Sequence, residues 1–175
     1  MTASAKAWPN AQQLLDLERQ VRRSGTGLTA QELQGCWQLQ LVWPKGNSRP
    51  SAFSGWLLRG LSARLEIDRA DDGLLLSNAV ALGPFVLRFR GQGCLNGKRP
   101  LLQFSFDQVE LSFSGRCLLQ RRLPAPPPQR LPFFALIHRD ANGWLAARGR
   151  GGGLALWCLA DRPAGVANME PPLAP

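Results

Sequence analysis

The sequence predicts an all-β protein, an antiparallel barrel of about eight or nine short strands that follows one N-terminal helix. From Gly35 onward, apolar residues recur with a period of two, which is the side-chain repeat of a strand. Turn signals rich in Gly, Asn and Asp separate these segments about every 8 to 12 residues. Only one stretch, near the start, has helical periodicity. The 175 residues suit a single domain.

The helix is expected over residues 11–23, because its apolar side chains follow the spacing of one helix face: Leu14, Leu15, Leu17 and Val21. Two glycines within residues 24–27 are typical of a helix end and a turn. Thr29 and Glu32 have the spacing of a capping box, which predicts a second helical turn over residues 29–33.

The first strands are defined by clean alternation and by short turns between them. They are expected over residues 36–43, 63–68, 74–82 and 85–90. Asp71–Gly73 and Asn96–Gly97 are typical hairpin turns. In the second and fourth of these strands Arg64, Arg88 and Arg90 alternate with apolar residues, so these arginines should point outward.

The alternation changes phase within the next segment. Leu102, Phe104 and Phe106 are followed by Val109, Leu111 and Phe113, so a bulge or a turn is expected near Asp107–Gln108. Residues 117–119 form at best a short strand, and Pro124–Pro128 is a loop that cannot pair in a sheet. Further strands are expected over residues 133–138, 144–148 and 154–159.

These elements predict three parts of the chain. Residues 1–34 are an N-terminal helical segment that packs on the barrel, residues 35–161 are the barrel, and residues 162–175 are a disordered tail rich in Pro and Ala. Neither a signal peptide nor a transmembrane segment is recognisable, so we expect an intracellular protein, cytoplasmic or peripheral to a membrane.

The net charge of +9 and the isoelectric point near 10.9 predict a polyanionic partner, either an anionic membrane surface or a nucleic acid. The basic residues are scattered, with no block of like charges. Arg64, Arg88 and Arg90, together with Arg59, are the candidates for contact with anionic lipid headgroups.

Residue types that carry catalysis are sparse. The single histidine, His138, has no partner that would form a triad, and the four cysteines include no CxxC pair, so neither a metal site nor an enzyme is expected. The glycine-rich stretch 148–153 lacks the Lys-Ser/Thr of a phosphate loop and is interpreted as a wide hairpin turn. No cofactor is expected.

The strongest functional signal is the large number of aromatic and aliphatic side chains on the strand faces. In a sandwich these side chains would be plain core, whereas in a barrel they would line an enclosed apolar cavity. The candidate cavity residues are Trp37, Leu39, Leu41, Leu65, Ile67, Leu76, Phe85, Leu87, Phe89, Phe104, Phe106, Phe133 and Leu156. Residues 52–61 are expected to form a lid or a membrane contact through Phe53, Trp56 and Arg59.

The order of the motifs resembles the plastid lipid-associated protein or fibrillin family, in the compact form of its cyanobacterial members. The resemblance spans Leu28 to Asp161, and the motifs that carry it are Leu33-Gln34-Gly35-Cys36-Trp37, Leu65-Glu66-Ile67-Asp68, Ser77-Asn78-Ala79-Val80, and Asp140 followed by residues 144–149 and 152–157. It implies a lipocalin-like barrel that associates with thylakoid membranes or lipid bodies and binds lipids, quinones or carotenoids.

The leading hypothesis is therefore non-catalytic binding, storage or transport of a small hydrophobic ligand. The alternative is a basic β-domain that binds nucleic acid through phosphates and exposed aromatic rings, although the scattered charge makes nucleic acid the less favoured partner. A third hypothesis is an enzyme or chromophore lyase on the same barrel, with Cys94 or Cys117 as the reactive group.

Overall fold

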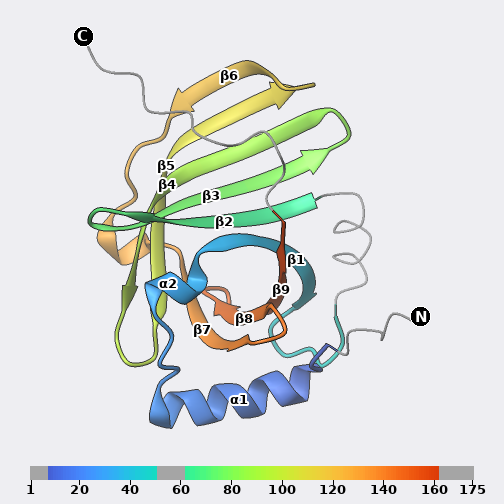
Figure 1. Ribbon diagram of the computed structural model, residues 1–175, viewed down its shortest axis with the longest axis vertical. Coiled ribbons are helices and arrows are strands. Elements are labelled where there is room, and N and C mark those ends of the chain that lie inside the picture. Colours follow the sequence, from blue (N-terminus) through green and yellow to red (C-terminus); the bar gives the residue numbers. More distant parts are fainter. Residues whose placement is uncertain (1–7, 51–61, 162–175) are drawn as a thin grey trace.

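A computed structural model describes residues 8–50 and 62–161 of the chain (Figure 1). These residues form two α-helices, one short 3-10 helix and nine strands. The elements are α1 (Ala11–Ser24), α2 (Ala30–Leu33), β1 (Gly35–Trp43), β2 (Ser62–Ala70), β3 (Gly73–Leu82), β4 (Phe85–Asn96), β5 (Leu101–Phe113), β6 (Arg116–Arg122), η1 (Pro128–Arg130), β7 (Phe133–Asp140), β8 (Trp144–Gly149) and β9 (Leu154–Ala160). The predicted helix, its capping-box successor and the hairpin turns are confirmed.

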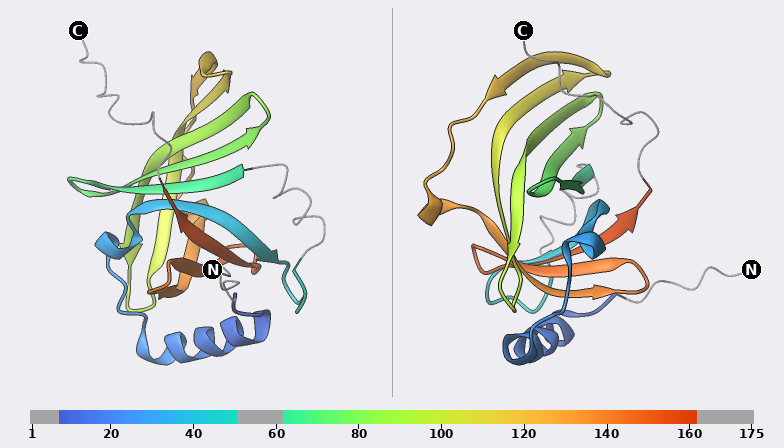
Figure 2. Two further views of the ribbon diagram at one scale, coloured as in Figure 1. Left: turned by 45° about the vertical axis from the view of Figure 1, so that its right-hand side comes forward. Right: turned by 60° about the vertical axis from the view of Figure 1, so that its left-hand side comes forward.

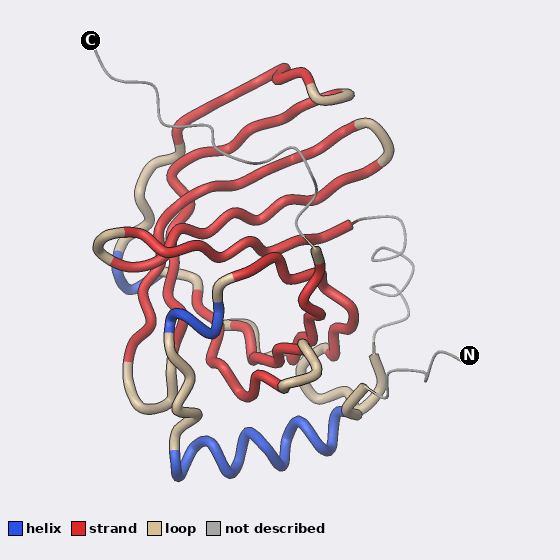
Figure 3. Tube along the Cα trace, viewed as in Figure 1, coloured by secondary structure: helices blue, strands red, loops and turns tan. Residues whose placement is uncertain are grey.

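The nine strands form one antiparallel sheet in the order β4-β3-β2-β1-β9-β8-β7-β5-β6. A further pairing joins β4 to β5, so that eight strands form a ring and β6 lies outside it. The prediction of a mostly β, antiparallel fold with one substantial N-terminal helix is thus confirmed (Figure 3).

Strand β5 changes its neighbour along its length. Residues Leu101–Gln103 pair with Phe133–Ala135 of β7 in antiparallel order, whereas Gln108–Phe113 pair with β6. Between these two ladders, the Phe104 amide donates to the Pro132 carbonyl at 3.2 Å and the Leu123 amide donates to the Asp107 carbonyl at 2.7 Å. The ring therefore closes at one end, while β3 to β6 continue past it as a curved sheet (Figures 1 and 2).

A β-bulge at Asp107 produces the phase change in β5. In the ladder with β4, Arg90 pairs with Gln108 and Gly91 pairs with Phe106, so Asp107 is the extra residue. The sequence prediction of a bulge or turn at Asp107–Gln108 is confirmed. Because Asp107 is an extra residue, even-numbered positions before it and odd-numbered positions after it lie on the same face of β5. The apolar residues on both sides of the bulge therefore face the inside of the ring.

One apolar cluster fills the inside of the ring, and a second lies on its outer side beneath α1. In the inner cluster α2 contributes Leu33, and the Trp37 indole donates to the Leu33 carbonyl at 2.7 Å. In the outer cluster Ala11 and Leu14 of α1 pack with Trp43 and Ile137. The helix therefore covers the outer face of β7, β8, β9 and the end of β1 (Figure 3).

Gly91, opposite the bulge, tests this description of β5. A Cβ at Gly91 would lie 1.8 Å from the Ser105 carbonyl oxygen and 2.7 Å from the Phe106 Cα, so Gly91→Ala must displace backbone. We expect a loss of about 2 kcal/mol or more in the free energy of unfolding, measured by urea titration. Gly149→Ala is the matched control, because its nearest neighbours would be 4.0 Å away. Equal stability of the two variants would contradict the register.

Candidate ligand-binding site

The closed part of the ring is filled by its own side chains. Its cluster comprises Leu33, Trp37, Leu65, Ile67, Leu74, Leu76, Leu102, Phe104, Leu136, Leu145, Ala147 and Trp157, none of which is more than 8% exposed. Five predicted cavity residues lie in this cluster, namely Trp37, Leu65, Ile67, Leu76 and Phe104, and Leu39 and Phe106 pack against it. These residues face the inside of the ring as expected, but they serve there as packed core.

Three predicted cavity residues lie elsewhere. Leu41 and Leu156 belong to the outer cluster under α1. An extra residue at Gln40 reverses the faces of β1 beyond it and brings Leu41 opposite Leu156, whose neighbour Trp157 is the inward residue of β9. Phe133 pairs with Gln103 on the outer side of β5, so the inward aromatic residue of β7 is Phe134. Single-residue shifts of this kind move a side chain to the opposite face of the sheet.

The other predicted residues, Phe85, Leu87 and Phe89, lie on the inward face of β4 where the sheet extends past the closed part of the ring. Register pairs continue this face into the neighbouring strands. We call the apolar side chains of this face the open face: Leu82, Phe85, Leu87, Phe89, Val109, Leu111, Phe113 and Leu119. Five of these side chains, Leu82, Phe85, Leu87, Phe113 and Leu119, are between 37% and 59% exposed. Arg116 and Arg121 of β6 lie on the same side by register.

A row of aromatic rings connects the packed core to the open face. Trp157 contacts Phe134 with ring centroids 5.2 Å apart, and Phe134 stacks on Phe104 at 5.3 Å. Phe104 then contacts Phe106 at 5.3 Å, and Phe106 contacts Phe89 at 5.7 Å. The floor of the open face is therefore anchored to rigid core, which favours a surface that keeps its shape.

The outer face of the same strands is polar and carries charges of both signs, because Arg64, Arg88 and Arg90 share it with Glu66, Asp68 and Glu110. Arg64 and Arg88 flank Ala79 in register on the two neighbouring strands, and Ala79 is buried between them. The Nη2 atom of Arg90 lies 3.8 Å from the Oε2 atom of Glu110. The outward direction expected for the three arginines is confirmed by these ladders.

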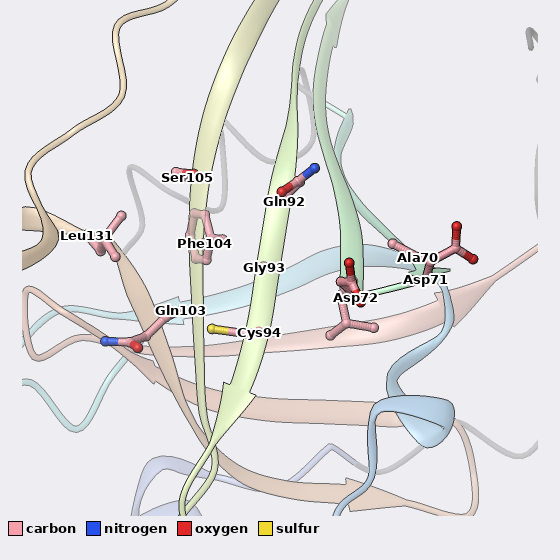
Figure 4. Close-up of a pocket in the computed structure, with 11 residues that line it drawn as sticks. Ala70, Asp71, Asp72, Gln92, Gly93, Cys94, Gln103, Phe104, Ser105 and Leu131 are labelled. Carbon is pink, nitrogen blue, oxygen red and sulfur yellow. The ribbon is translucent and has the colours of Figure 1, made fainter. Parts of the chain in front are cut away.

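A pocket of mixed polar and apolar lining, about 450 Å³ in volume, lies against β4 and β5 at the end of the β2–β3 hairpin (Figure 4). Asp71 and Asp72 of the hairpin turn stand on one side and Leu131, from the loop before β7, stands on the other. Cys94 lies on its floor, where its sulfur accepts a hydrogen bond from the Asn96 side chain at 3.1 Å. Its acidic rim and mixed lining do not resemble an apolar ligand site.

The predicted lid residues Phe53, Trp56 and Arg59 lie outside the described residues. The remaining candidates for chemistry are dispersed. The His138 ring lies at a tilt against Trp144, with ring centroids 5.0 Å apart, and its Nε2 lies 3.8 Å from the Asp140 carboxylate, which accepts a hydrogen bond from the Asn142 amide. Cys36 is buried, whereas Cys94 and Cys117 are exposed on different strands. Among the described residues, no cluster of His, Cys, Asp and Glu has the composition of a metal site.

One buried electrostatic centre gave no signal in the sequence. Glu18 of α1 is 2% exposed and accepts hydrogen bonds from Arg148 of β8, with Nε at 2.8 Å and Nη2 at 2.5 Å. Arg99, in the turn between β4 and β5, donates at 2.7 Å, and Arg22 of α1 donates at 3.2 Å. Arg99 and Arg148, which are 81 and 130 positions from Glu18 in sequence, thus hold the helix against the ring.

The arginines set the ionisation of Glu18. Burial alone raises the pKa of its carboxyl group, but the hydrogen bonds and positive charges of Arg148 and Arg22 outweigh that effect and hold the pKa below its ordinary value. A carboxylate with a lowered pKa in the folded state stabilises the fold above the pKa of the unfolded chain. This contribution is lost as the pH falls through the folded-state pKa.

Comparison of the chain with protein-family models, with curated proteins and with solved structures finds no match. Within the described residues, neither α-helix has the length and hydrophobicity that crossing a bilayer requires.

The Glu18 cluster predicts a pH-dependent loss of stability. Replacing Glu18→Gln should lower the free energy of unfolding by about 2 to 3 kcal/mol at neutral pH, because three arginines lose a charged acceptor. In urea titrations, the difference from wild type should narrow as the pH falls below about 4.3, the ordinary glutamate pKa. Asp16→Asn is the control, because Asp16 pairs with Arg19 on the exposed side of α1. A pH-independent difference would contradict this assignment.

Proposed function

We propose that this protein is a non-catalytic binding protein for a small hydrophobic ligand and that the open face holds the ligand. The single observation that carries the proposal is the exposure of five large apolar side chains on one inward-facing surface. Soluble proteins rarely leave apolar side chains gathered in this way, and such patches mark binding sites. The ring of eight strands supports the interpretation as a lipocalin-like barrel, and the resemblance to the plastid lipid-associated family proposes a lipid, a quinone or a carotenoid.

The chemistry of the open face suits an elongated apolar molecule. Its floor contains the rings of Phe85, Phe89 and Phe113, and aliphatic side chains lie between them. A ligand that covers about 200 Å² of this surface would gain about 5 kcal/mol from that burial before the cost of association. Adding the burial of the ligand's own apolar surface, we expect micromolar affinity.

The distribution of aromatic residues favours this function over nucleic-acid binding. Trp37, Trp43 and Trp157 are buried, so they offer no face for stacking with bases. Three of the five exposed side chains of the open face are leucines, which contact hydrocarbon rather than bases. Arg64 and Arg88, on the opposite side of the sheet, are the candidates for contact with anionic lipid headgroups at a thylakoid membrane or a lipid body, whereas Arg90 on that side is paired with Glu110.

A titration with cis-parinaric acid tests the site. Fluorescence should rise on binding to the wild-type protein, and Leu87→Asn should weaken binding about fivefold, because it places an amide in the middle of the open face. Leu75→Asn is the matched control, since Leu75 is an exposed leucine on the outward side of β3. Its affinity should equal that of wild type. Equal loss in both variants, or no binding by wild type, would contradict the proposal.

Extraction with organic solvent, followed by mass spectrometry, identifies the natural ligand. Protein purified from its native host should release one lipid, quinone or carotenoid in stoichiometric amount. An empty extract together with tight, salt-sensitive RNA binding would favour the nucleic-acid alternative instead.

A further inference from the structure

Two hairpin turns at the end of the open face are held side by side. The β3–β4 turn (residues 82–85) and the β5–β6 turn (residues 113–116) are joined by a hydrogen bond from the Ser114 amide to the Pro84 carbonyl at 2.8 Å. Phe85 and Phe113 are register partners whose ring centroids lie 4.8 Å apart. We call this pair of turns the tip; it lies at the far end of the curved sheet from α1 (Figures 1 and 2).

The tip exposes apolar side chains and has no charge until Arg116 ends it. Leu82 is 59% exposed, and Phe85 and Phe113 are more than 40% exposed. The other turn residues are Gly83, Pro84, Ser114 and Gly115. Short turns that project large apolar residues can enter the interface of a bilayer without burying a charge.

Arg116 ends the tip, and two further arginines lie at the far end of β6. Strand β6 carries Arg116, Arg121 and Arg122, has no acidic residue, and exposes all its side chains. Leu118 and Leu119, between these arginines, are 59% and 55% exposed. An apolar tip followed by exposed cations has the order of a membrane-docking element, in which hydrocarbon enters the interface and guanidinium groups remain at the headgroups.

We propose that the tip inserts into the surface of a bilayer that contains anionic lipids, with β6 lying against the headgroups. A second copy of the chain is a poorer partner for the tip and β6. Antiparallel pairing of two β6 strands centred on Leu119 would place Arg116 of one copy opposite Arg122 of the other. Like charges directly opposite each other destabilise a strand pair.

This docking rests on the proposed function and deepens it, because the tip continues into the open face through Phe85 and Leu87. A hydrophobic ligand would then pass between the bilayer and the open face without crossing water. The Arg121 side chain, opposite Val109 on the same face, lies beside that path, where it would meet an anionic headgroup.

Flotation with vesicles tests the tip. The full chain should bind vesicles of phosphatidylcholine mixed with phosphatidylglycerol and should bind vesicles of phosphatidylcholine alone at least about fivefold more weakly. Leu82→Asp should weaken binding about tenfold or more, because a carboxylate replaces a side chain that enters the interface. Leu75→Asp, at an exposed leucine away from the tip, should change it less than about twofold.

A second pair of variants tests the cationic strand. Arg116→Gln should weaken vesicle binding about fivefold, the usual effect of one cation at an anionic surface. Arg69→Gln, an exposed arginine at the opposite end of the sheet, should leave binding within about twofold of wild type. Both pairs should retain wild-type thermal unfolding.

The outcomes separate this proposal from the proposed function. Absence of vesicle binding, or an equal loss of vesicle binding in Leu82→Asp and Leu75→Asp, overturns the proposal that the tip docks on a bilayer. Binding of parinaric acid without vesicles would still support the ligand site. A dimer that forms through the tip and prevents vesicle binding overturns it in favour of a second copy. RNA binding that is lost in Arg116→Gln but kept in Leu82→Asp overturns it in favour of nucleic acid.

Discussion

The change of neighbour along β5 is the constraint on which the rest of the structure depends. Its first residues bond to β7 and close the ring, and its last residues bond to β6, which leads away from the ring. Where the ring is closed, inward side chains meet one another and form a dry core. Where β6 has replaced β7, inward side chains of the same pattern have fewer partners and remain exposed. One strand therefore produces both a stable scaffold and an apolar surface, from a single alternation of residues.

Much of this arrangement could be predicted from the sequence, because it depends on local periodicity. The alternation from Gly35, the capping box at Thr29 and Glu32, and the bulge at Asp107 are all confirmed. The bulge was predictable because the apolar positions of β5 change from even to odd numbers across it. Most inward residues followed from the same rule, which is why the predicted cavity list contains both the packed core and part of the open face.

The remaining features depend on contacts that periodicity does not encode. The bulges at Gln40 and Ile137 place Leu41 and Ile137 on the helix side. Leu39 and Leu41 continue one alternation through Gln40, and Ile137 directly follows the apolar Leu136, so neither bulge changes the sequence pattern visibly. Phe133 and Phe134 are adjacent, so only pairing with β5 decides which one faces inward. The Glu18 cluster joins residues far apart in sequence, and a glutamate on an amphipathic helix gives no sign that three arginines surround it. Strand β6, expected as a short strand at best, extends over Arg116–Arg122 because β5 supplies its partner.

The division of the inward surface into a packed part and an open part is tested most directly by NMR. Amide chemical shifts of the labelled protein would be recorded while a small apolar probe is added. We expect shifts at Leu87, Phe89, Val109 and Leu111, with little change at Trp37, Ile67 and Leu145 in the closed part of the ring. Shifts centred instead on Asp72, Cys94 and Gln103 in the pocket at the β2–β3 hairpin, or spread evenly through the packed core, would rule this division out.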